Sequence, residues 1–184
     1  FIVLFILLAI YFVTKKKNIM LSVAFVTMAT AIKYLGILIL PFIILYHLRG
    51  KSILEKIKYC VLYGLEFIVI LAGFYAIYVR DLNIFAGLFV QQAKYNRSIM
   101  LVFYYLLGTD AMKIFKVVLL VIFAGIYIST VSKLIINDNK KTFSTYIRQY
   151  NPLLYIFTFV LITNFNSWYI LWLFPTLMFL NGKN

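Results

Sequence analysis

The sequence contains very little cysteine, histidine and acid. Its 184 residues include one cysteine, Cys60, one histidine, His47, and five acidic residues against eighteen lysines and arginines. One cysteine excludes an internal disulfide and a Cys-x-x-Cys pair, and one histidine excludes a metal site built from several histidines. The sequence also has no phosphate-binding glycine loop, nucleophile elbow or metal-ligand cluster. We therefore expect neither a metal ion nor a cofactor.

Charged residues are scarce as well. They make up 12% of the chain, whereas 65% of residues are hydrophobic and the mean hydropathy is +0.99. Soluble domains hold about 45–50% apolar and about 25% charged residues. Because a chain of this size cannot bury such a surplus in its own core, lipid is the predicted solvent. Continuous apolar runs favour helices over a barrel of alternating strands, so the predicted fold class is all-α, a polytopic transmembrane helix bundle in a single domain.

Apolar runs separated by polar or basic residues predict the positions of the helices. They are expected over residues 1–13, 19–32, 35–48, 59–79, 113–132, 150–164 and 168–181. Residues 80–112 are expected to form an outer loop, and residues 52–58 a short amphipathic segment on the membrane surface. The first run is shorter than the ~20 residues that a span needs, so we expect the chain to be the C-terminal part of a longer protein.

The net charge of +13 would suggest nucleic acid in a soluble protein. Here the cations lie in short clusters between apolar runs, as in loops that flank membrane spans. No nucleic-acid partner is therefore expected, and the expected location is a membrane that the chain crosses several times.

The stretch 18–48 is either one kinked helix or a hairpin of two short helices. A hairpin puts twelve cations on the cytoplasmic side: Lys15, Lys16, Lys17, Arg49, Lys51, Lys56, Lys58, Lys133, Lys140, Lys141, Arg148 and Lys183. It leaves four outside: Arg80, Lys94, Arg97 and Lys113. A single crossing divides them almost evenly, so the positive-inside rule favours the hairpin. Each arm would rise ~21 Å, less than the ~30 Å hydrocarbon core, which predicts a cavity above its bend.

Lys33 is the most informative candidate for a functional residue. A lysine inside an apolar run costs roughly 2.5–3.5 kcal/mol on insertion scales, and such charges are functional hypotheses by default. At an outward-facing bend, Lys33 is a candidate for binding an anionic phosphate. The alternative is a lysine whose ammonium snorkels to the interface.

The predicted outer loop holds further candidates. Lys94 and Arg97 stand among amides and a tyrosine, a combination that suits a phosphate or a sugar, although an ordinary solvated loop has the same composition. Asp81 and Asp110 are candidate general bases, each without a partner in the sequence. Trp168 fits the aromatic belt at a membrane interface.

Three stretches together suggest a family. They are ATAIKYLGILILP at 29–41, AKYNRSI at 93–99 followed by YYLL at 104–107, and NFNSWYILWLFP at 164–175. In this order they resemble the GT-C superfamily of membrane glycosyltransferases, most closely its polyprenyl-phosphate-sugar-dependent, mannosyltransferase-like members. The resemblance covers residues 21–180. One departure is Tyr95, where the family usually has phenylalanine.

The resemblance implies transfer of a sugar, such as mannose, from a polyprenyl-phosphate donor to a glycan, lipid or protein acceptor outside the cytoplasm. The membrane would be the plasma membrane of a prokaryote or the endoplasmic reticulum of a eukaryote. The implied donor site comprises Lys33, Lys94 and Arg97. The implied outer cavity comprises Asn96, Ser98, Asn166 and Trp168. The family's catalytic acid lies in the first outer loop, which we expect upstream of Phe1.

Three other functions compete with this hypothesis. A transporter or flippase of lipid-linked sugars also uses short or broken helices and intramembrane charges. A polysaccharide polymerase also presents a large outer loop. The third alternative is a structural subunit of a membrane complex.

Overall fold

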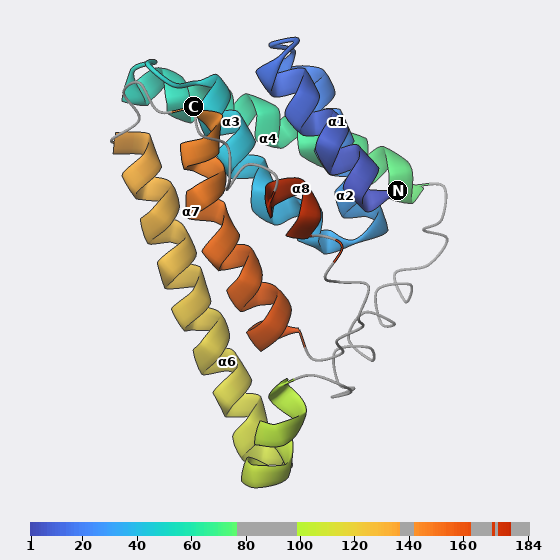
Figure 1. The fold of residues 1–184 in the computed structure, drawn as a ribbon, viewed down its shortest axis with the longest axis vertical. Coiled ribbons are helices and arrows are strands. Elements are labelled where there is room, and N and C mark those ends of the chain that lie inside the picture. The colour runs from blue at the N-terminus through green and yellow to red at the C-terminus, as the bar shows by residue number, and fades with distance from the viewer. Residues whose placement is uncertain (77–98, 137–141, 163–170, 172, 178–184) are drawn as a thin grey trace.

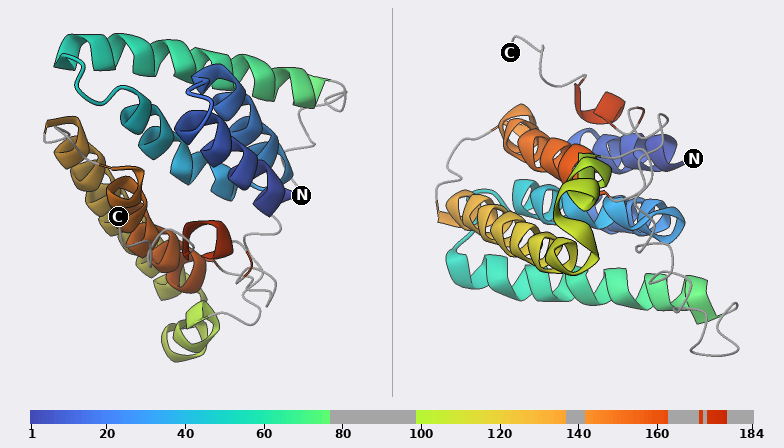
Figure 2. Two further views of the ribbon diagram at one scale, coloured as in Figure 1. Left: turned by 45° about the horizontal axis from the view of Figure 1, so that its top comes forward. Right: turned by 90° about the horizontal axis from the view of Figure 1, so that it is seen from below.

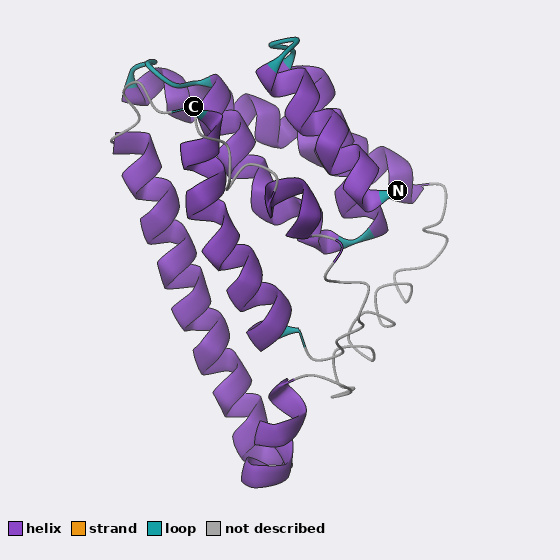
Figure 3. Ribbon diagram, in the orientation of Figure 1, coloured by secondary structure: helices purple, strands orange, loops and turns teal. Residues whose placement is uncertain are grey.

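The computed structural model describes residues 1–76, 99–136, 142–162, 171 and 173–177, and over these residues the chain is helical, without a strand (Figures 1 and 3). The predicted all-α class is therefore confirmed for the part of the chain that is described. The elements in order are α1 (Ile2–Thr14), α2 (Ile19–Ile32), the 3₁₀ helix η1 (Tyr34–Ile39), α3 (Leu40–His47), α4 (Ile53–Ala76), α6 (Ile99–Ile136), α7 (Phe143–Tyr155), the π-helix η3 (Ile156–Leu161) and α8 (Phe174–Leu177).

Helices α1 and α2 form an antiparallel pair joined by the lysine-rich turn (Figure 1). The side chain of Asn18 caps α2 by accepting a hydrogen bond from the backbone N–H of Leu21 at 3.1 Å. The buried Ser22 hydroxyl donates to the carbonyl of Ala9 across the pair at 2.7 Å. Because that hydroxyl has a partner, a polar group is buried here without cost. Helix α2 spans the residues 19–32 that the apolar run predicts.

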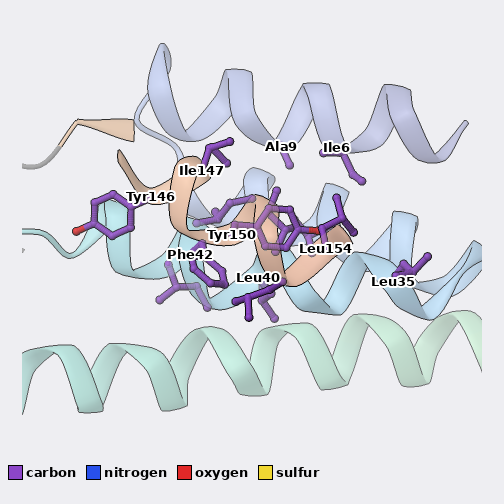
Figure 4. Packing of buried hydrophobic residues seen from close by; sticks show 14 of the residues in the cluster. Ile6, Ala9, Leu35, Leu40, Phe42, Tyr146, Ile147, Tyr150 and Leu154 are labelled. Carbon is purple, nitrogen blue, oxygen red and sulfur yellow. The ribbon is translucent and has the colours of Figure 1, made fainter. Parts of the chain in front are cut away.

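The stretch 18–48 doubles back, as the hairpin hypothesis requires. Helix α2 leads away from the lysine turn, while η1 and α3 return toward it (Figure 4). A hydrogen bond from the Tyr75 hydroxyl to the Ala31 carbonyl, 3.1 Å, places the last turns of α4 and α2 at the same end. The single helix expected over 35–48 is wrong in one respect: residues 34–39 are a 3₁₀ helix, and α3 begins only at Leu40, with Pro41 in its first turn.

Helix α4 begins at Ile53, so the amphipathic segment 52–58 is the first part of a long helix and not a separate surface piece. Ser52 and Glu55 form a capping box. The Glu55 carboxylate accepts from the Ser52 backbone N–H at 3.0 Å, and the Ser52 hydroxyl accepts from the Glu55 N–H at 3.3 Å. The helix predicted over 59–79 therefore starts six residues earlier, and residues 77–79 lie outside the described part.

Helix α6 is longer than predicted. The sequence suggests a loop over 80–112 and a helix over 113–132, but residues 99–136 are helical apart from a sharp kink at Gly108. The predicted outer loop is thus wrong for residues 99–112. Asp110 lies on this helix and pairs with Lys113, three residues further on, at 2.9 Å in an exposed position.

Helix α7 also begins earlier than predicted. The run over 150–164 is divided between α7, which starts at Phe143, and the π-helix η3, which ends at Leu161. Pro152 lies inside α7, where its ring removes one backbone hydrogen bond. Of the helix predicted over 168–181, the structure describes only α8 and residues 171 and 173.

The core lies between the short helices α1, α2 and α3 and helix α7 (Figure 4). Fully buried side chains include Phe42, Ile43, Tyr146 and Ile147. The rings of Phe42 and Tyr150 lie 5.3 Å apart, close enough for a favourable aromatic contact. The short helices therefore find their apolar partners within the protein.

Helices α4 and α6 are different. They are long and apolar enough to cross a membrane, over Ile53–Ala76 and Met100–Ile136, yet only 11% and 6% of their most apolar windows are buried. The two helices meet where the Lys56 ammonium donates to the Ile135 carbonyl at 2.8 Å, and from there they diverge (Figure 2, left). A core helix of a soluble protein would be mostly buried.

Candidate functional site

Lys33 lies at the bend between α2 and η1. Its backbone is extended (φ −154°, ψ 125°), its N–H donates to the Ala29 carbonyl at 2.9 Å, and its carbonyl accepts from the Gly36 N–H at 3.2 Å. This one residue therefore ends α2 and starts the returning segment. Its side chain is half-buried. The position at a bend, predicted from the apolar run, agrees with the structure.

The bend depends on the close approach of Gly36 to α2. A Cβ atom at Gly36 would lie 2.7 Å from Thr30 Oγ1 and 2.8 Å from the Thr30 nitrogen. The Thr30 hydroxyl is held in place by donating to the Val26 carbonyl at 2.8 Å. Only glycine fits here, so the sequence folds back at this point because Gly36 has no side chain.

Several elements meet at this bend. The Tyr75 hydroxyl of α4 bonds the Ala31 carbonyl, and the Tyr34 ring of η1 stands edge-on to Phe157 of η3 at 6.3 Å. The two residues on either side of the bend, Ala31 and Tyr34, thus connect it to α4 and η3. A lysine ammonium has three donors and no acceptor, so Lys33 at this bend suits an oxygen-rich anion.

Six other predicted site residues lie outside the described residues: Lys94, Asn96, Arg97, Ser98, Asn166 and Trp168. The helices that lead toward them end near Lys33. Helix α4 ends at Ala76, next to the Tyr75 contact, and η3 ends one turn beyond Phe157. The structure thus brings the starting points of both segments to the end of the molecule where Lys33 lies.

The opposite end is strongly cationic. It carries Lys15, Lys16, Lys17, Arg49, Lys51, Lys58 and Lys133, and we call it the basic end. Arg49 stacks on the ring of Tyr46 at 4.2 Å, and Lys51 lies 3.9 Å from the carboxylate of Glu55. Lys56 is buried and is used inside the protein, bonded to α6.

Buried polar atoms on α7 and η3 were not predicted. Asn151 Oδ1 and Thr158 Oγ1 are buried without a hydrogen-bond partner, and the Asn151 amide makes one long bond, 3.5 Å, to the Thr176 carbonyl. They flank Pro152 and the π-helix, and π-helical turns are frequent at functional sites. The Asn151–Pro152 dipeptide was the available signal, since Asn-Pro marks breaks in regular structure.

The described residues contain no group of three or more histidine, cysteine, aspartate or glutamate side chains that could bind a metal ion. Asp110, a candidate base, is paired with Lys113. The described geometry offers a half-buried lysine at a helix break, near which Tyr75 bonds the Ala31 carbonyl and Tyr34 contacts Phe157.

Comparison with known proteins gives no relative. No family model, no curated protein and no solved structure matches the chain.

Proposed function

We propose that this chain is part of a multi-pass integral membrane protein whose helices α4 and α6 face lipid. The observation that carries the proposal is the low burial of two long apolar helices. Exposed side chains follow their lengths, among them Val61, Leu65 and Val69 on α4 and Val117 and Val121 on α6. In water each such side chain would forgo about 1.5–3 kcal/mol of favourable burial. Lipid removes that penalty.

The basic end would then face the cytoplasm. Lysine and arginine collect on cytoplasmic loops, and the turns at both ends of the 18–48 hairpin lie at the basic end. Lys33 would accordingly face the opposite side. Helix α2 has 14 residues and rises ~21 Å, so the Lys33 ammonium would lie below the outer surface, at a depth where a lipid-linked phosphate could meet it.

We further propose that the full-length protein transfers a sugar from a polyprenyl-phosphate donor to an acceptor outside the cytoplasm. The support is the resemblance of 29–41, 93–107 and 164–175 to the GT-C glycosyltransferases, together with the position of Lys33 at a bend remote from the basic end. In that reaction a general base takes the proton of the acceptor hydroxyl, the acceptor oxygen bonds to the anomeric carbon, and the bond from that carbon to the phosphate oxygen breaks.

Lys33 would bind the phosphate of the lipid-linked donor and would also stabilise the negative charge on that phosphate as it departs. The resemblance assigns the general base to the family's first outer loop. Lys94 and Arg97 remain predictions for the donor site, and Asn96, Ser98, Asn166 and Trp168 for the acceptor cavity.

The test uses the full-length protein in membranes with a labelled polyprenyl-phosphate sugar. Lys33→Ala should raise the KM for the donor about 10- to 100-fold, because a hydrogen bond to a charged group contributes about 1.5–3 kcal/mol. Lys16→Ala at the basic end is the matched control and should leave KM unchanged. Absence of transfer with all common donors would disprove the enzymatic proposal. Equal KM values for the two variants would remove Lys33 from the donor site.

One observation favours a transporter instead. The chain breaks regular helix twice, at η1 and at η3, and broken helices with exposed backbone groups line the substrate sites of many transporters. Reconstituted vesicles separate the two functions: movement of an intact lipid-linked sugar between leaflets, without any sugar transfer, would support the transporter.

A further inference from the structure

Helix α6 has a sharp kink at Gly108. The backbone angles of this residue, φ 77° and ψ 177°, belong to a region that is essentially restricted to glycine, and they divide α6 into a short arm, residues 99–107, and a long arm, residues 109–136. The rings of Phe103 and Phe115 lie 4.8 Å apart. Twelve residues of straight helix would separate them by about 18 Å. The short arm therefore bends away from the axis of the long arm at Gly108, at the lower end of Figure 1.

A methionine is fully buried on each side of the kink. Met100 on the short arm and Met112 on the long arm are both fully buried, at the end of a helix that is otherwise exposed along most of its length. Methionine is flexible and fills irregular gaps well. The short arm is thus a packed element with a fixed position.

The outer side of the short arm is apolar and aromatic. Tyr105 is 78% exposed and Leu106 is 74% exposed, and Val102 and Leu107 are exposed beside them. The exposed Asp110–Lys113 ion pair follows directly at the start of the long arm. Tyrosine, leucine and a charged pair side by side suit neither water nor hydrocarbon alone. They suit the boundary between the two, where amphipathic rings and helices lie.

The length of the long arm places this boundary. From Ile135, bonded to Lys56 at the basic end, to Gly108 is 27 residues, or about 41 Å of helix. A bilayer with its headgroup layers measures about 40–45 Å. Residues 117–132, between Lys116 and Lys133, contain no charged residue. With the basic end at one headgroup layer, Gly108 reaches the other.

We propose that residues 99–107 form an interfacial helix that lies in the outer headgroup layer, with Gly108 as the corner that turns the chain from the span into the membrane plane. The partner is the lipid surface itself. The inference rests on the membrane placement of α6 proposed above and is independent of sugar transfer.

Depth-dependent quenching tests this placement. Single cysteines at Leu106, Val121 and Lys16 are introduced into the full-length protein without other cysteines, labelled with an environment-sensitive fluorophore and reconstituted into phosphatidylcholine vesicles. The vesicles carry bromine at a shallow or a deep acyl position, and iodide is the aqueous quencher. The Leu106 label should be quenched more by shallow than by deep bromine, the Val121 label more by deep bromine, and the Lys16 label by iodide.

The outcomes separate this inference from the membrane proposal. If Val121 is deep but Leu106 responds only to iodide, or is as deep as Val121, the interfacial helix is wrong and the span stands. If Val121 responds only to iodide, the membrane placement fails and the inference with it.

A second variant tests the corner. Gly108→Ala cannot keep φ 77° without strain, so the short arm should change direction and the Leu106 label should change depth. Gly125→Ala is the matched control, because it lies within the long arm with open space at its Cβ position. The control should leave the label where it was. An unchanged depth in Gly108→Ala would show that Gly108 does not set the arm's direction.

Discussion

The short helices of this chain are packed within the protein, whereas the long helices are mostly exposed on its surface. Helices α1, α2 and α3 have 13, 14 and 8 residues, and each buries one apolar face in the core that they share with α7, although side chains such as Leu4 and Met20 are exposed. Helices α4 and α6 have 24 and 38 residues, and most of their apolar surface is exposed. The short helices are the more apolar set: α1, α2 and α3 contain no lysine, arginine, aspartate or glutamate, whereas α4 and α6 contain four such residues each. Hydrophobicity alone therefore does not explain why the long helices are the exposed ones.

Length explains the difference. A helix that rises about 21 Å cannot cross a ~30 Å hydrocarbon core by itself, so it needs neighbours within the protein. A helix of 24 or more residues can cross with lipid around it. Four substitutions test whether the short helices are packed within the protein and the long helices are in contact with lipid.

The largest effect is expected in the core of the short helices. Phe42→Ala removes a fully buried ring that contacts Tyr127 and Tyr150 and should lower the free energy of unfolding by about 3–5 kcal/mol. Phe74→Ala on the exposed side of α4 is the matched control, expected to change it by about 0.5 kcal/mol or less. Unfolding of the purified protein by SDS in micelles measures both. Similar losses would show that α4 is as tightly packed as α3.

The second-largest effect is expected from a charged residue introduced on a long helix. Val121 is exposed and lies about 21 Å from Ile135 along α6, near the middle of a bilayer. Val121→Arg should cost about 2.5–3.5 kcal/mol in a membrane, against about 0.5 kcal/mol or less on a surface in water. Met20→Arg, exposed next to the lysine turn, should be tolerated because its guanidinium reaches the headgroups. Membrane insertion and folded yield report the cost. Equal tolerance of both variants would contradict lipid contact at α6.

The close contact at the bend should give an intermediate effect. Gly36→Ala places a methyl group 2.7 Å from Thr30 Oγ1 and should destabilise the protein by about 1–3 kcal/mol. Gly64→Ala in α4 meets open space and should stabilise its helix by up to about 1 kcal/mol. The SDS concentration at the midpoint of unfolding should fall for Gly36→Ala and rise for Gly64→Ala. If Gly36→Ala left the stability unchanged, the backbone at the bend could shift to accommodate a methyl group at little cost.

The smallest effect concerns the start of α4. Ser52→Ala removes the hydroxyl half of the capping box with Glu55 and should cost about 1 kcal/mol. Ser132→Ala, exposed inside α6, should be neutral or slightly stabilising because alanine favours helix. Thermal unfolding followed by circular dichroism measures the difference in stability between the two variants. A Ser52→Ala variant as stable as Ser132→Ala would show that lipid contact alone fixes where α4 begins.

The sequence predicts elements well where charges border an apolar run. Lys15–Lys17 and Asn18 define the turn before α2, and Lys33 with Gly36 defines the bend, because charges and glycine stand where the helix must stop. It fails at the start of α4, where the amphipathic pattern of residues 52–58 predicts a separate surface segment although Ser52 and Glu55 have the spacing of a capping box. It fails again in α6, where Gly108 and Asp110 suggest a loop but lie within a kinked helix.

The candidate site is predictable in part. Lys33 stands out because a charge inside an apolar run has few explanations. The buried Asn151 and Thr158 do not stand out, since burial of a polar side chain depends on packing between distant segments such as α7 and α8. The 3₁₀ and π forms of η1 and η3 likewise depend on tertiary contacts, and their sequences are ordinary apolar runs.

The hydrogen bond from Lys56 to the Ile135 carbonyl connects α4 and α6 near the basic end. It joins α4 and α6 at one end only, and beyond it the two helices separate. As long as this bond is kept, any change in the angle between them leaves the basic end in place and moves the opposite end. Over the ~36 Å of α4, a rotation of about 10° displaces its last turn, next to Lys33, by about 6 Å. A small change of angle at the basic end thus becomes a large displacement at the opposite end.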